Sequence, residues 1–336
     1  MPLRLSVLDQ APISQGSSGG DALRHSVDLA RHCEQLGYTR YWVAEHHGTP
    51  MLACASPEVL ISAIGAATSR MRIGSGGVML PHYSPLKVAE NFSMLTGMYG
   101  ERIDLAIGRA PGSDPITAFA LQRDRRVASP DDFPEQLGEL LAYVNDAMPV
   151  THRFARLAKL PGGAQRPDVW LLGSSPQSGV WASELGLPYA FADFINPIGG
   201  VEIAAHYRQH YTPSASHPAP RVLAAIWALC AETDAEAERL AASSRMAFTL
   251  FLQGRLIPVP PVETALQFLD EHTDEVDALG RRRRWLVGSP DTVKPGIEAL
   301  AAEYGAEEVM VVTITYDHDA RKRSYELLAK ALGLTE

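Results

Sequence analysis

Short apolar runs alternate with longer stretches of helical periodicity along most of the 336 residues. Runs that are rich in β-branched and aromatic residues predict buried strands, and apolar residues three and four positions apart predict amphipathic helices. Eight strands are expected, each followed by helical sequence: Leu3–Leu8, Tyr41–Ala44, Met71–Leu80, Ile103–Ile107, Val169–Leu172, Tyr189–Phe191, Val222–Ala231 and Glu308–Ile314.

Signals at the ends of the expected helices support this division. Ser56-Pro57 and Ser84-Pro85 each predict a helix start, because serine caps a helix and proline suits its first position. Gly37 is expected to end the first helix, because glycine is the usual residue just beyond a helix C-terminus. Two stretches, 110–130 and 252–290, lack this regular alternation and are interpreted as insertions after the fourth and seventh strands.

Eight strand–helix units without a break in composition predict one α/β domain over residues 1–336, a (β/α)8 TIM barrel. A doubly wound open sheet is the alternative. Residues 9–20, which follow the first strand, contain no GxGxxG turn of the kind that such sheets use for dinucleotides. In a barrel, both insertions would lie on the active-site side, where they could wall a substrate pocket or form a lid.

The composition excludes several classes of partner. The net charge of −9 argues against nucleic acid and against an anionic membrane, because both need a cationic surface. No apolar run approaches the roughly 18 residues of a membrane span, and the first residues do not resemble a signal peptide. Cys33, Cys54 and Cys230 form no CxxC motif and predict neither a disulfide framework nor a zinc site. A cytoplasmic protein without a metal is expected.

The most distinctive polar residues follow the second expected strand, at Glu45, His46 and His47. The carboxyl ends of parallel strands bind ligands in such folds, so these side chains are candidates for chemistry. Neighbouring residues of a strand point to opposite faces, so His46 and His47 are not both expected in one site. The ordinary alternative is a buried, hydrogen-bonded histidine. Other polar residues at strand ends complete the candidate site: Asp9, Gln10, His82, Arg109, Ser174, Ser175 and Asp193.

Two further patterns indicate a ligand. The segment Gly173–Ser178 precedes a helix, so its hydroxyls and the free N–H groups of the first turn could hold a phosphate or carboxylate. Arg109 could add a guanidinium to that anion. Simple helix capping and a structural salt bridge are the alternatives. Gly76-Gly77 lies inside an expected strand and indicates a bulge, an unusual dihedral angle or the close approach of a flat ligand.

The chain resembles the luciferase-like flavin monooxygenases over nearly its whole length. Each matching segment alone is weak evidence for the family, but the presence of five segments in the family's order is specific to it. The segments that carry the resemblance are Tyr41–His47, Arg72–Pro81, Gly100–Arg109, Gly173–Ser178 and Val287–Val293.

The resemblance implies a (β/α)8 barrel that binds reduced flavin mononucleotide, FMN, at the carboxyl ends of its strands. His46 matches the family's catalytic histidine, which serves in proton transfer near the flavin. Arg109, Ser174, Ser175 and Ser178 match positions that hold the flavin phosphate. Gly76-Gly77 falls where relatives have a non-prolyl cis peptide against the flavin ring.

The implied reaction starts from reduced FMN (FMNH2), supplied by a separate flavin reductase. The reduced flavin reacts with O2 to form a flavin C4a-peroxide, which oxidises a small organic substrate. Glu45 would orient His46 or serve the barrel structurally. Gly108 stands where the catalytic subunit of bacterial luciferase has a reactive cysteine, so light emission is not expected. The resemblance also implies a homodimer formed by the helices after strands two and three.

Two other functions stay open from the sequence. Related barrels use the deazaflavin F420 to transfer hydride without oxygen, and this chain could be an F420-dependent reductase or dehydrogenase. It could also be a non-catalytic flavin-binding subunit, as in heterodimeric luciferases. The presence of both His46 and Arg109 argues against that third function.

Overall fold

Eight parallel strands close into a barrel in the computed structural model, which describes residues 3–110, 113–122, 124–126, 131–157, 159–272 and 284–335. The pairing of β6 with β7 and of β1 with β9 completes the ring, so the predicted TIM barrel is confirmed. In ring order the strands are β1 (Arg4–Asp9), β2 (Arg40–Val43), β3 (Arg72–Met79), β4 (Ile103–Gly108), β5 (Asp168–Gly173), β6 (Tyr189–Ala192), β7 (Val222–Cys230) and β9 (Glu308–Val312).

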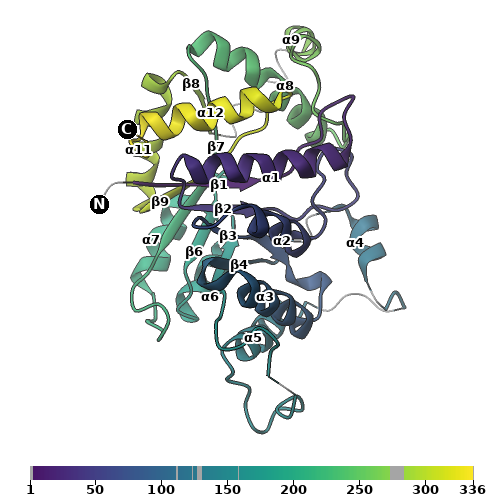
Figure 1. The fold of residues 1–336 in the computed structure, drawn as a ribbon, viewed down its shortest axis with the longest axis vertical. Coiled ribbons are helices and arrows are strands. Elements are labelled where there is room, and N and C mark those ends of the chain that lie inside the picture. Colours follow the sequence, from purple (N-terminus) through teal and green to yellow (C-terminus); the bar gives the residue numbers. More distant parts are fainter. Residues whose placement is uncertain are drawn as a thin grey trace.

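Helices cover the outside of the barrel, and those near the two ends of the chain, α1 and α12, lie side by side (Figure 1). No helix within the described ranges is long and apolar enough to cross a membrane. The covering helices are α1 (Gly19–Gln35), α2 (Pro57–Ala67), α3 (Pro85–Tyr99), α5 (Phe133–Val144), α6 (Pro176–Glu184), α7 (Gly200–Gln209), α8 (Asp234–Leu252), α11 (Pro290–Tyr304) and α12 (His318–Ala331), with short 3-10 turns η1 (Leu80–His82) and η2 (Gly100–Arg102).

The predicted helix ends are confirmed. Ser56 and Ser84 are the N-caps of α2 and α3, and each is followed by the expected proline. Gly37 lies just beyond the C-cap of α1 with a φ of +82°, a left-handed conformation that suits glycine. These features are local, which is why the sequence predicts them correctly.

The two insertions contain more regular structure than the sequence predicts. The first holds α4 (Pro115–Leu121), whose N-cap Asp114 accepts hydrogen bonds from the N–H groups of Ile116 and Thr117. The second holds α9 (Val262–Glu271) and β8 (Trp285–Gly288), which pairs with the last residues of β7. Elements this short give little periodicity. Residues 111–112, 123, 127–130 and 273–283 of these insertions lie outside the described part.

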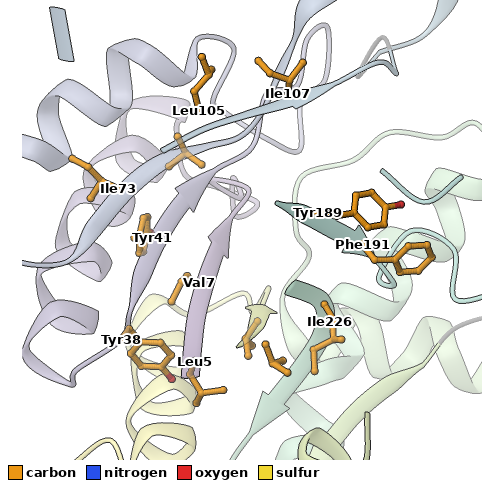
Figure 2. Close-up of a cluster of buried hydrophobic side chains, with 14 of the residues drawn as sticks. Leu5, Val7, Tyr38, Tyr41, Ile73, Leu105, Ile107, Tyr189, Phe191 and Ile226 are labelled. Carbon is orange, nitrogen blue, oxygen red and sulfur yellow. The ribbon is translucent and has the colours of Figure 1, made fainter. Parts of the chain in front are cut away.

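The core has two layers because side chains alternate between the two faces of each strand. Leu8, Trp42 and Trp170 belong to the inner layer, inside the barrel. Val7, Tyr41 and many others belong to the outer layer, between the barrel and its helices (Figure 2). The inner layer therefore limits how much space remains inside the barrel for a ligand.

A buried ion-pair network fills the amino end of the barrel. The guanidinium of Arg40 on β2 bonds to Asp104 Oδ2 on β4 and to Glu308 Oε1 on β9, both at 2.6 Å. Asp104 also accepts hydrogen bonds from Arg72 Nε and Trp42 Nε1, each at 2.8 Å. Burial opposes the charge of Arg40, but the two carboxylates outweigh burial and raise its pKa. The network joins strands that are not all neighbours in the sheet.

Removing the shared carboxylate should destabilise the fold strongly. We expect Asp104→Asn to lower the free energy of unfolding by about 3–5 kcal/mol, because the buried guanidinium of Arg40 loses a partner. Urea denaturation measures this change. Glu307→Gln, which removes an exposed partner of Arg4, should cost less than about 1 kcal/mol. Similar small losses in both variants would contradict this account.

Candidate functional site

A cavity of about 690 Å³ opens at the carboxyl ends of the barrel strands. Ligand sites typically measure roughly 300–1,000 Å³, so this cavity can hold a ring system together with a second small molecule. Its described lining is mostly apolar, and four small residues, Ala44, Ala190, Ala192 and Ala225, leave the space open. The polar side chains in the described lining are Gln10, His46, His47, Thr49, Ser113, Asp114 and Ser244.

His46 lies just beyond β2, and one nitrogen of its ring forms no hydrogen bond with the described residues. Its backbone N–H donates to the Cys54 carbonyl at 2.9 Å, which fixes the chain at this point. Its side-chain Nδ1 is buried and has no hydrogen-bond partner in the described part of the chain. Burial, with a smaller contribution from His47, lowers the pKa of His46 to about 4. The imidazole is therefore neutral at pH 7 and can bond to a ligand.

Glu45 serves His47 rather than His46, so the predicted option that Glu45 orients His46 is wrong. Glu45 is fully buried, and its Oε1 lies 2.7 Å from His47 Nε2. It also accepts hydrogen bonds from the Tyr83 hydroxyl at 2.9 Å and from the Met79 N–H at 3.0 Å. This carboxylate therefore fixes His47 and joins the end of β2 to the end of β3.

Both histidines line the cavity, which contradicts the prediction that only one would enter a single site. The prediction assumed that strand alternation continues through His47. In the structure β2 ends at Val43, so the following residues no longer alternate between opposite faces.

The peptide bond between Gly76 and Gly77 is cis, as the family resemblance implies. Gly76 lines the cavity. A Cβ atom at Gly76 would lie 2.6 Å from Leu8 Cδ1, and one at Gly77 would lie 2.8 Å from the Ala106 carbonyl oxygen. A side chain at either position would have to displace these neighbours, and at Gly76 the backbone itself forms part of the cavity wall.

The start of α6 can receive an anion. Ser175 is the N-cap, its hydroxyl makes no capping bond, and Ser175, Pro176 and Gln177 are exposed. The N–H groups of a first helical turn have no partners within the helix, although Pro176 itself has no N–H. The Arg109 guanidinium lies 5.6 Å from the ring centre of Trp181 on α6, so it reaches this helix. Arg109 also pairs with Asp131 at 2.9 Å, and both side chains are largely exposed. Ser174 is half-buried in the turn that precedes the helix.

Ser178 differs from the other residues that are predicted to hold a phosphate, because its hydroxyl already has partners within the protein. Its side chain is buried, and its hydroxyl lies 2.8 Å from the Ser175 carbonyl and 3.0 Å from the Tyr189 hydroxyl. These two partners already engage the hydroxyl. The structure therefore shows Ser178 fastening the first turn of α6 to β6.

Two predicted site residues face away from the cavity. Asp9 is buried against the helices, where its Oδ1 bonds to Arg321 at 2.7 Å. Burial raises the pKa of Asp9, but Arg321 and hydrogen bonds outweigh this effect and hold it below its usual value. Asp193 Oδ2 accepts a hydrogen bond from Tyr304 on α11. Strand alternation explains both errors, because the preceding residue in each case, Leu8 or Ala192, lines the cavity instead.

The sequence analysis missed four aromatic residues that line the cavity: Phe194, Trp227, Phe248 and Phe251. Aromatic residues are common in a core and at its edge, so nothing in the local pattern marks these four. One signal was present on α8. Ser244, Ala247, Phe248 and Phe251 recur at helical spacing, which places them on one face of that helix.

The fold and this cavity define an α/β-barrel protein with a ligand site at the carboxyl ends of its strands. The family model "Luciferase-like monooxygenase" matches residues 3–308, and the chain belongs to this family. A relative from Escherichia coli K12, named luciferase-like monooxygenase, is 39% identical over 328 residues, which cover 97% of this chain and 96% of the relative. The N-acetyl-S-alkylcysteine monooxygenase of Bacillus subtilis is 36% identical over 337 residues, covering 98% of each chain.

Solved structures agree with the fold. The structure of apo-MsnO8 has a TM-score of 0.92 and 41% identity, and the match covers 99% of both chains. More distant barrels carry either flavin-type cofactor. The oxygenating component of 3,6-diketocamphane monooxygenase from Pseudomonas putida, in complex with FMN, has a TM-score of 0.72 at 21% identity. An F420-dependent secondary alcohol dehydrogenase has a TM-score of 0.68 at 16% identity. At these identities the likeness concerns the fold alone.

The lowered pKa of His46 predicts how stability changes with pH. Between pH 6.5 and 4 the unfolded chain binds a proton at this histidine and the native protein does not, so stability falls as the pH falls. The full shift corresponds to about 3 kcal/mol. We expect His46→Gln to lose much less stability than the wild type between pH 7 and 4.5, measured by urea denaturation. His210→Gln, at an exposed position, should behave like the wild type. Equal pH dependence in all three proteins would contradict a buried neutral His46.

Proposed function

We propose that this chain is a flavin-dependent monooxygenase that uses reduced FMN and O2 to oxidise a small organic substrate. Named relatives with 36–39% identity are monooxygenases, which supports this class of reaction. The observation that carries the proposal is the cavity itself. It joins a backbone surface at Gly76 to the unpaired Nδ1 of His46, and its lining includes Leu172 on β5, the strand that leads into the start of α6.

The described residues offer positions for both the phosphate and the ring of FMN. The phosphate would bind at the start of α6, near the N–H groups, Ser174 and Ser175. The Arg109 guanidinium, which lies against Trp181 of the same helix, would exchange its partner Asp131 for the phosphate. The flavin ring would lie against the backbone at Gly76, the residue of the glycine pair that lines the cavity. Ser178 would act indirectly, by fixing the turn that carries the other groups.

When bound, reduced FMN supplies the two electrons with which one atom of O2 enters the substrate and the other leaves as water. The chain would contribute three things to this reaction. Neutral His46 can accept a proton or a hydrogen bond at Nδ1. The Glu45–His47 pair holds a second imidazole at the cavity. The mostly apolar lining excludes water.

The proposal includes two partners, a separate flavin reductase that supplies FMNH2 and a second copy of the chain. An exposed apolar surface on α2 and α3 supports the homodimer. Val59, Met94 and Met98 on these helices are 69%, 50% and 54% exposed, and the two helices pack against each other. A partner that covers these apolar side chains would remove them from water and so add stability.

The oxygen reaction tests this function directly. Protein loaded anaerobically with reduced FMN is mixed with oxygenated buffer in a stopped-flow instrument, and flavin absorbance is followed. We expect oxidation about tenfold slower than that of free reduced FMN, because the site excludes water and controls protons. His46→Asn should bind FMN within about twofold of the wild type and oxidise faster than it, because it loses a proton-handling group. His210→Asn should match the wild type.

Oxidation at the rate of free reduced FMN would contradict an oxygen-activating site. The same protein would then be titrated anaerobically with reduced F420. Tighter binding of F420 than of reduced FMN would favour hydride transfer without oxygen.

A further inference from the structure

Four aromatic side chains, Phe194, Trp227, Phe248 and Phe251, form one wall of the cavity, which we call the aromatic wall. The ring centres of Phe194 and Trp227 are 6.0 Å apart, as are those of Phe248 and Phe251. Trp285 of β8 connects the two pairs, 5.2 Å from Trp227 and 6.0 Å from Phe248. The wall is therefore a continuous set of packed rings rather than four separate contacts.

The aromatic wall lies across the barrel from the glycine pair. In the ring of eight strands, β3 carries Gly76, and three strands separate it from β7 in either direction. Trp227 belongs to β7, and its side chain is part of the inner layer of the barrel. The α6 start follows β5, which lies midway between β3 and β7 in the ring, with only β6 between it and β7. At Trp227 the wall thus bounds the part of the cavity opposite Gly76, against which the flavin ring is proposed to lie.

The described lining offers little to a charged ligand. It contains neither lysine nor arginine, and Nε2 of His47 already faces Glu45 Oε1 at 2.7 Å, so no lysine or arginine can pair with a carboxylate or phosphate there. Its one acidic side chain, Asp114, is engaged in capping α4, where it accepts bonds from Ile116 N–H, Thr117 N–H and the Thr117 hydroxyl. His46 is neutral at pH 7. A charged ligand would lose its hydration at this wall without gaining an equivalent partner.

We propose that the substrate is an uncharged aromatic compound whose ring packs against the aromatic wall. This inference rests on the proposed function, because it assigns the opposite half of the cavity to the flavin. Packed aromatic rings bind another ring in offset or edge-to-face geometry, and the mostly apolar surroundings favour a neutral one. The oxidised position of the substrate would then lie between the wall and Gly76.

Binding of four matched probes to the protein saturated with oxidised FMN tests this proposal. The probes are 2-acetylnaphthalene, which is neutral and aromatic, the anion 2-naphthoate, the cation (2-naphthylmethyl)trimethylammonium, and the saturated analogue 2-acetyldecalin. Calorimetry at pH 7 measures each affinity. We expect the neutral aromatic probe to bind at least about tenfold more tightly than either charged probe and several-fold more tightly than the decalin.

Variants locate the binding site. Phe251→Ala should lower the affinity for the neutral aromatic probe about tenfold and change the affinity for FMN by less than about twofold. Phe251 is 46% exposed, so its removal is a small risk to the fold, and Phe248→Leu gives a second variant with a milder change. Phe119→Ala is the matched control, because Phe119 is 49% exposed and lies outside the described lining. It should leave all affinities unchanged.

Three results would overturn the inference. They are tighter binding of a charged or saturated probe, unchanged affinity in both wall variants, and displacement of FMN by the neutral probe. Failure of the proposed function gives a different signature. In that case FMN would not bind, or its oxidation would not be slowed, while the neutral probe would still bind with the expected ranking and still depend on Phe251.

Discussion

The buried contact of Arg40 with Asp104 and Glu308 closes the amino end of the barrel, and the position of the site depends on it. Charged groups held by direct partners occupy that end, so a ligand has no room there. Towards the carboxyl end, alanines such as Ala190 and Ala225 replace larger residues inside the barrel. The cavity therefore opens at the carboxyl end of the barrel, where the longest connections between elements begin.

The sequence predicts the barrel because each unit carries its own signals. Serine–proline helix starts, a glycine helix end and buried strands are local features, and the structure confirms them. The short elements α4, α9 and β8 gave too few periods to be recognised. Side-chain direction at strand ends was the other weakness. Asp9 and Asp193 are strand-end acids that face the helices. A shift of one residue along a strand moves a side chain from the inner face of the barrel to the outer face.

His46 and His47 show how much of a site depends on tertiary contacts. They are neighbours in the chain and both line the cavity, yet of the two histidines only His47 bonds to Glu45. His46 keeps an unpaired nitrogen and a pKa lowered to about 4. The family resemblance predicts His46 as the catalytic residue, but the electrostatic difference between His46 and His47 could be seen only in the fold. The aromatic wall likewise unites β7, α8 and the end of β6, which no local pattern relates to one another.

The central claim, that FMN is held by its phosphate at α6, is tested most directly by comparing reduced FMN with reduced riboflavin. Anaerobic titration gives the ratio of the two dissociation constants. The wild type should bind reduced FMN more tightly than reduced riboflavin. Arg109→Ala should reduce that preference about tenfold while hardly changing the affinity for riboflavin. Arg126→Ala, which removes an exposed arginine paired with Asp124, should retain the full preference. An unchanged preference in Arg109→Ala would contradict the claim.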